Sequence, residues 1–247
     1  MITHKRRVAE AWRWLVVVLF ALAMAWVESS VVFYLRTMID RIDPYQANPL
    51  PISRGFAKAE LIREAATIVM LASVSWLAGR TARTRLGYFL IAFGVWDIGY
   101  YVFLRPLTGW PRTLLDWDVL FLIPLPWWGP VVAPCLIAGL MVMLGTLVTQ
   151  FARAGGAAWP RRASMATGMV GIALALYTFV ADAIGVVAKG ETALREMLPV
   201  CFLWPLFGVA LLLMTVPVAD VAWQVWCRAC AERAKTSTGF VHESFFS

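Results

Sequence analysis

The sequence holds only two histidines, His4 and His242, and both fall in the terminal segments. A haem held between membrane helices usually takes an axial histidine, and zinc and copper sites rely on imidazole nitrogen. The sequence therefore predicts neither haem b nor a zinc site, and it leaves the identity of any other cofactor open.

Sequence motifs for several other common activities are also absent. No GxxxxGK[ST] motif is present, which argues against nucleotide hydrolysis by a P-loop. None of the four lysines lies in the middle of an apolar stretch, so a retinal Schiff base is excluded. The four cysteines form no disulfide framework, and Cys227-x-x-Cys230 has neither a second pair nor a nearby histidine to complete a metal site.

Apolar residues dominate what remains. Hydrophobic residues make up 61% of the chain and charged residues 15%, whereas soluble domains are about 45–50% apolar. Stretches of about twenty apolar residues recur, each long enough to cross a bilayer as a helix. The first is too long for a signal peptide. We expect an all-α polytopic integral membrane protein with about six transmembrane helices, forming one domain over 1–235 followed by a short tail, 236–247. The expected spans are 14–35, 61–79, 86–104, 130–151, 164–187 and 198–219.

Basic residues indicate the topology. They concentrate before the first span, in the 80–85 and 152–163 connections, and after the last span. The positive-inside rule then predicts that both termini are cytoplasmic in a multi-pass protein of the cytoplasmic (inner) membrane. A pI near 9.6 is explained by cytoplasmic loops facing anionic membrane lipid, so no nucleic-acid partner is expected.

One apolar run, 119–151, is too long for a single span and contains four prolines. We expect two pieces, with a span that starts near Pro130. The first piece, about 113–128, has two interpretations. It is either a re-entrant segment that brings Asp116 and Asp118 to a cavity, or an interfacial segment anchored by tryptophans.

Three expected spans each carry an acid followed seven or eight residues later by a base. Charges inside hydrocarbon are costly and are kept with a partner or a function. The bases at helix ends can reach the headgroups, but the shorter acids cannot. The acids of several spans share one depth near the outer face, which predicts an outward-facing ligand site. The three pairs are Glu28/Arg36, Asp97/Arg105 and Asp182/Lys189. The candidate ligand-binding residues are Glu28, Arg36, Asp97, Tyr100, Tyr101, Arg105, Asp116 and Asp118.

Carboxylates and tyrosines suit a hard cation or a proton, and arginines add a grip on zwitterionic or phosphate-bearing solutes. Three classes of function remain open. The first is a small transporter or ligand-binding membrane protein for a cation or polar solute. The second is an accessory subunit of a larger membrane complex, and the third is a membrane-embedded enzyme on a lipid-linked substrate. Membrane lipid, other membrane subunits and a homo-oligomer are the partners that these classes imply.

Overall fold

A computed structural model describes residues 2–38, 40, 42–46, 54–121, 125–151 and 158–243. Within them the chain is mostly helical. The elements are α1 (Ile2–Met38), α2 (Arg54–Ala78), α3 (Ala82–Thr108), β1 (Trp117–Phe121), β2 (Trp127–Pro130), α4 (Val132–Gln150), α5 (Arg162–Val187), α6 (Glu191–Glu196) and α7 (Trp204–Glu243).

Six of these helices are long and apolar enough to cross a membrane, which agrees with the expected number. Their apolar parts are Val8–Met38, Leu61–Ala78, Ala82–Thr108, Val132–Gln150, Arg162–Val187 and Trp204–Ala231. The sixth begins later than expected, at Trp204 rather than at 198, after the short helix α6. Pro205 suits this start, because proline is favoured in the first turn of a helix. α7 also continues as helix through 236 to Glu243.

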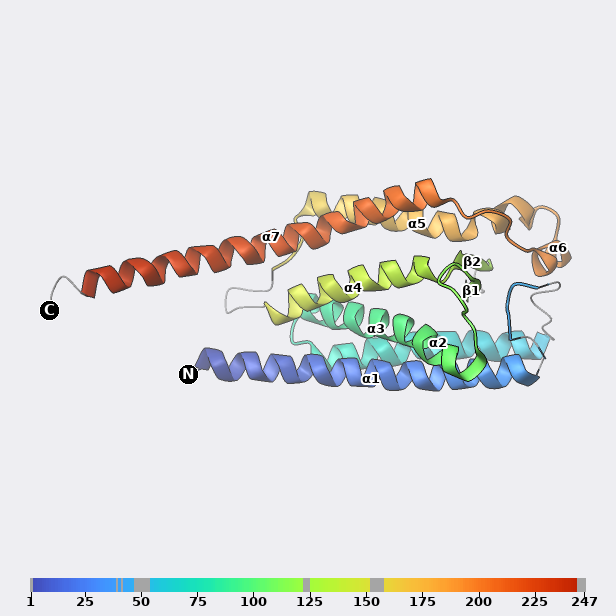
Figure 1. Ribbon diagram of the computed structural model, residues 1–247, viewed down its shortest axis with the longest axis horizontal. Coiled ribbons are helices and arrows are strands. Elements are labelled where there is room, and N and C mark those ends of the chain that lie inside the picture. The colour runs from blue at the N-terminus through green and yellow to red at the C-terminus, as the bar shows by residue number, and fades with distance from the viewer. Residues whose placement is uncertain are drawn as a thin grey trace.

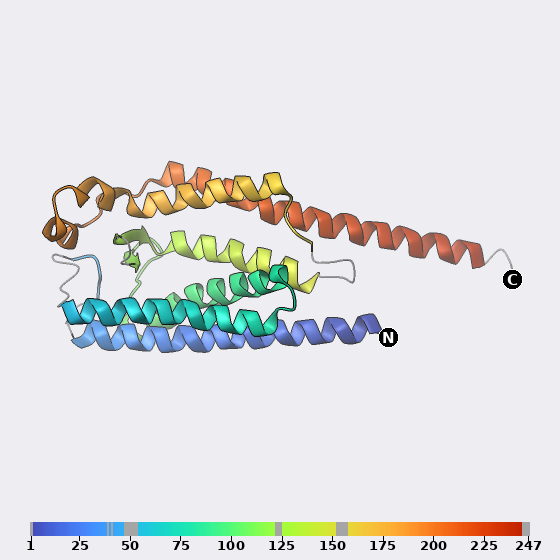
Figure 2. The same cartoon turned by 180° about the vertical axis from the view of Figure 1, so that it is seen from behind.

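The long helices run roughly parallel to one axis and alternate in direction (Figure 1). α1, α2 and α3 lie together on one side of the molecule and α5 pairs with α7 on the other, while α4 lies between and contacts both α3 and α7 (Figures 1 and 2). Both termini lie at the same end, which we call the termini end. β1, β2 and α6 lie at the opposite end, which we call the hairpin end. α7 projects beyond the other helices at the termini end.

The described residues of 113–128 form no helix. β1 and β2 pair antiparallel, with Trp117 opposite Pro130 and Val119 opposite Trp128. The fold is mostly helical, as expected, and its described part adds one small β-hairpin. Aromatic and β-branched side chains favour strands, and the prolines in this stretch disfavour a helix. This hairpin sets the position of Asp118, which lies on β1.

α3 and α4 pack with their backbones in close contact. A Cβ on Gly145 would lie 2.4 Å from the carbonyl oxygen of Gly87, and a Cβ on Gly94 would lie 2.5 Å from the carbonyl oxygen of Ala138. Glycine is needed at these positions because any side chain would push the helices apart. α3 itself starts with a capping box between Thr81 and Thr84. It ends at Thr108 and is followed by the capping residue Gly109, whose φ of 73° suits glycine.

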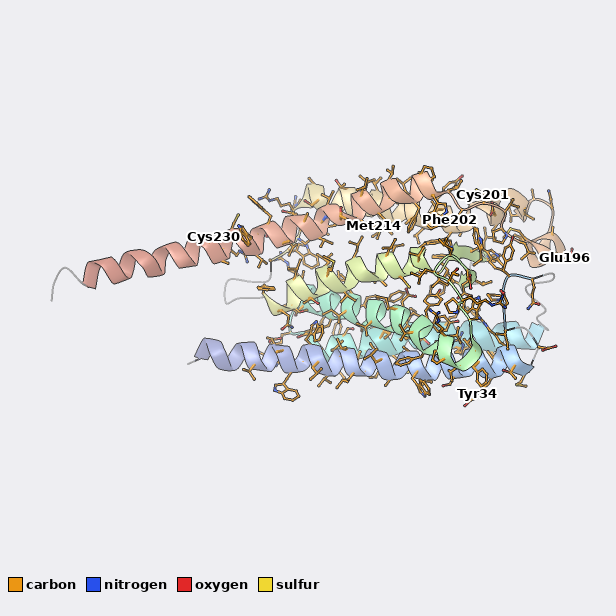
Figure 3. The ribbon with its side chains drawn as sticks, in the orientation of Figure 1. Tyr34, Glu196, Cys201, Phe202, Met214 and Cys230 are labelled. Atoms are coloured by element: carbon orange, nitrogen blue, oxygen red, sulfur yellow. The ribbon has the colours of Figure 1, made fainter. Side chains whose placement is uncertain are left out.

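Large apolar side chains cover the outside of the bundle. At the termini end, tryptophans on three helices are about two-thirds exposed: Trp12 on α1 (62%), Trp76 on α2 (62%) and Trp226 on α7 (65%). Exposed tryptophans near helix ends are typical of a membrane interface. Inside the bundle, Phe202 and Met214 (Figure 3) belong to the core shared by α4, α5 and α7, which also contains Phe179 and Phe207.

The close contact of α3 and α4 predicts a difference between two glycines of α4. Gly145→Ala should lower the thermal stability of the detergent-purified protein by the equivalent of about 1–3 kcal/mol, because the new methyl group overpacks the contact. Gly139→Ala is the matched control, since a Cβ there meets nothing within 4 Å. It should leave the midpoint unchanged or raise it. Equal midpoints for the two variants would contradict the close contact.

Candidate functional site

Charged side chains from three helices and the hairpin meet near the hairpin end. Glu28 on α1 is buried and forms an ion pair with Arg63 on α2. Glu64 adds a further carboxylate beside Arg63. Arg36 lies two helical turns beyond Glu28, about 12 Å along the axis, so the two residues of this sequence interval are not a direct pair.

Arg36 instead pairs with Asp118 of β1. One guanidinium nitrogen lies 3.0 Å from a carboxylate oxygen of Asp118, whose side chain is only 2% exposed. The same guanidinium lies over the ring of Trp110, 4.4 Å from its centroid, and donates a hydrogen bond to the carbonyl oxygen of Ile42. Arg36 therefore links α1 to the hairpin, to the end of α3 and to the segment after α1.

Burial and nearby polar groups act in opposite directions on the charge of Asp118. Burial raises the pKa of its carboxyl above the ordinary value, although Arg36, the Val119 amide and the Tyr101 hydroxyl all stabilise the charged form. The Val119 amide donates to it at 2.9 Å. Among these partners only Arg36 carries the opposite charge. The charged form of Asp118 therefore depends on Arg36, because an unpaired buried charge is far more costly than a paired one.

Asp97 lies on α3 beside this pair. Its electrostatic neighbours are Asp118, Tyr101 and Cys135 of α4. Within the described residues no hydrogen-bond donor and no basic side chain contacts its carboxylate. Asp97 occupies the same place in its sequence segment as Glu28 does in α1, yet Glu28 has a basic partner and Asp97 has none among these residues.

Tyrosines join the parts of the cluster. The rings of Tyr100 and Tyr101 meet edge to face with centroids 4.9 Å apart. Tyr100 interacts electrostatically with both Arg36 and Arg63. The Ser29 hydroxyl, which lies next to Glu28, donates to the carbonyl oxygen of Tyr100 at 2.9 Å and so ties α1 to α3.

The charges of this cluster do not balance. We define the hairpin-end cluster by its five charged side chains. Two carboxylates are matched by two guanidinium groups, which leaves the carboxylate of Asp97 without a counter-charge in the cluster. The five side chains therefore carry one excess negative charge, and Glu64 beside Arg63 adds to this acidic excess. Its members are Glu28, Arg36, Arg63, Asp97 and Asp118.

Two predicted site residues lie apart from the cluster. Arg105 is exposed on α3. Asp116 shapes the turn before β1, where it accepts hydrogen bonds from the Arg112 amide at 2.7 Å and the Thr113 hydroxyl at 2.7 Å. Slight burial raises the pKa of Asp116, but these hydrogen bonds outweigh it and hold the pKa below the ordinary value.

The third acid–base interval also lies outside the cluster. Asp182 is half-buried on α5, Lys189 is exposed beyond its end, and no ion pair joins these two described side chains. Tyr34, which follows Glu28 in sequence, is 59% exposed on α1 (Figure 3).

Three contacting residues were absent from the predicted set. Arg63 had a usable signal, because its place near the start of the second span puts it at the depth of Glu28. Cys135 carried no signal, because a cysteine in an apolar stretch is an ordinary packing residue and its neighbour Asp97 lies on another helix. Trp110 carried no signal, since an aromatic ring under a guanidinium depends on a tertiary contact.

Metal binding is not favoured by the arrangement. Among the described residues, no three histidine, cysteine, aspartate or glutamate side chains lie close enough together to hold a metal ion. The carboxylates of Glu28 and Asp118 are each directed to an arginine instead. The described part of the cluster therefore suits a proton or an ammonium group better than a multiply coordinated metal.

Comparison of the chain with protein-family models, with curated proteins and with solved structures gives no match. The class of protein thus rests on the structure itself. Six long apolar helices with a tryptophan-rich periphery are compatible with a polytopic, multi-pass membrane protein.

The buried ion pair predicts a non-additive pair of substitutions. Asp118→Asn and Arg36→Met should each destabilise the purified protein by about 3–5 kcal/mol, because each leaves a buried charge without its partner. The double variant should cost clearly less than the sum of the two. Arg105→Met, at an exposed arginine, should stay within about 0.5 kcal/mol. Thermal unfolding in detergent measures all four, and strictly additive losses would contradict a direct pair.

Proposed function

We propose that this chain is a small transporter or ligand-binding membrane protein that takes up a proton or a small ammonium-bearing solute at Asp97. The proposal rests chiefly on one observation, the unmatched carboxylate of Asp97 beside the Arg36–Asp118 pair. An ionised acid without a counter-charge is costly at membrane depth, so the residue is stable there when it binds a proton or a cation.

The direction of access is part of the proposal. Basic residues flank the helices at the termini end, among them Arg80, Arg83 and Arg162, all exposed. The positive-inside rule then places that end in the cytoplasm and the hairpin end outside, in a cytoplasmic membrane. The hairpin-end cluster faces the outer side in this orientation.

The arrangement of the pairs favours this function over the two others. Paired charges in an accessory subunit would be used to dock partner helices, but Glu28 and Arg36 both find partners inside this chain. An enzyme that used Asp116 and Asp118 together would need them to converge on a substrate. Asp116 is instead engaged by its own turn, and Asp118 by Arg36.

Flux into proteoliposomes tests the proposal. Purified protein is reconstituted in vesicles, and the entry of protons, sodium and methylammonium is followed under an inside-negative potential. We expect the wild-type protein to conduct at least one of these probes. Asp97→Asn should reduce the flux to that of protein-free vesicles, because an amide can neither bind a proton nor balance a cation.

Asp182→Asn is the matched control, since it removes an acid from α5 outside the cluster. It should retain the wild-type flux, and the thermal midpoints of both variants show whether they are folded. Wild-type flux by Asp97→Asn would refute the role of Asp97. Equal fluxes from wild-type and protein-free vesicles for all three probes would refute transport of these ions.

A further inference from the structure

A second polar cluster lies at the termini end and takes no part in the proposed site. The hydroxyl of Tyr88, a fully buried residue of α3, donates a hydrogen bond of 3.1 Å to Glu10 of α1. Glu10 also pairs with Arg13, one turn along α1. Gln150, at the end of α4, donates to the backbone carbonyl of Glu10 at 3.3 Å. We call this group the termini-end clasp.

α1, α3 and α4 all contribute side chains near both ends of the bundle. At the hairpin end, α1 contributes Arg36, α3 contributes Asp97 and Tyr101, and the start of α4 contributes Cys135. At the termini end they contribute Glu10, Tyr88 and Gln150. The residues between the two clusters form an apolar core. It includes Val17, Ala21, Ala25, Ile91 and Ala92.

The packing of these helices is unequal along their length. α3 and α4 touch backbone to backbone at two levels, Gly87/Gly145 and Gly94/Ala138, so they form one rigid unit. α1 meets α3 through small groups at Ala25, whose methyl group would lie 2.9 Å from a Cβ on Gly99. Next to this contact the rings of Trp26 on α1 and Phe103 on α3 meet edge to face, with centroids 5.4 Å apart. The two helices are therefore held together at this level, which makes it the fulcrum for a tilt of α1.

The Ala25–Gly99 contact lies between the two clusters. At 1.5 Å per residue, Glu10 is about 22 Å from Ala25 along α1, and Arg36 is about 16 Å from it on the other side. A tilt of α1 about this point moves its two ends in opposite directions relative to α3 and α4. Separation at one end therefore presses the other end together.

We propose that α1 pivots at Ala25–Gly99, so that the termini-end clasp and the Arg36–Asp118 pair open alternately as the two gates of one pathway between α1 and the α3–α4 unit. This rests on the proposed function, because it describes how the bound group at Asp97 gains access to each side in turn. Both gates are closed in the present structure, and the apolar core separates them.

Cys135 is a native reporter of the hairpin-end gate. It is half-buried next to Asp97, whereas Cys201, Cys227 and Cys230 are exposed elsewhere and can be changed to serine. With Cys135 as the sole thiol, its labelling rate by a charged methanethiosulfonate reagent is measured by mass spectrometry on protein in lipid nanodiscs. No ligand is required for this measurement.

Weakening one gate should change exposure at the other. Asp118→Asn should speed the labelling of Cys135, because it releases the hairpin-end gate. Glu10→Gln and Tyr88→Phe should each slow it, by roughly five-fold or more, since they favour the state that is open at the termini end and closed at the hairpin end. Tyr88→Phe removes only the hydroxyl that binds Glu10. It therefore tests the same contact if Glu10→Gln fails to fold.

Asp220→Asn is the matched control. Asp220 is an acid of α7 at the termini end that binds Ser164 and the Arg161 amide, outside the clasp, and its removal should leave the labelling rate unchanged. Unchanged or faster labelling in both Glu10→Gln and Tyr88→Phe would overturn the coupling. The outcome is separate from the flux assay, which can fail for the three chosen probes while the labelling pattern holds.

Discussion

The cost of placing charge in a low-dielectric bundle governs the polar interior of this protein. Arg36 and Asp118 can be buried because each supplies the counter-charge of the other, and Trp110 and the Ile42 carbonyl complete the surroundings of the guanidinium. Without that pair, each of the two side chains would be a buried charge without its partner, which is strongly destabilising. Asp97, beside it, has no such compensation among the described residues, and this contrast is the basis of the functional proposal.

The β-hairpin is the element that makes the pairing possible. Helices alone would leave the connection between α3 and α4 as a loop, whereas β1 and β2 hold Asp118 at a fixed depth against α1 and α3. Tyr45, in the segment after α1, also packs on the hairpin, where its ring stacks on Trp117. Its hydroxyl donates a hydrogen bond of 2.8 Å to the carbonyl oxygen of Pro199, which lies before α7. The hairpin therefore connects the α1–α2–α3 side to the α5–α7 side.

Small residues and polar contacts join different helices of the bundle. Gly87, Gly94 and Gly145 bring α3 and α4 together so closely that the two helices act as one body. α1 is joined to that body by ring and hydroxyl contacts along its length, such as Trp26 with Phe103, and by charged contacts at its ends, Glu10 to Tyr88 and Arg36 to Asp118. Hydrogen bonds and ion pairs can break and re-form singly, while interlocked backbones cannot, so a pivot of α1 is the natural motion of this arrangement.

The sequence by itself determined the helical class, the six apolar helices and the clustering of basic residues near one set of helix ends. These are local properties, because a spanning helix satisfies its own backbone hydrogen bonds and its length follows from composition. Only the tertiary structure decided which acid meets which base. Arg36 and Asp118 are 82 positions apart, and Glu28 finds Arg63 on a neighbouring helix. Such contacts depend on how helices pack and on a hairpin register, neither of which is written in the spacing of charges along one helix.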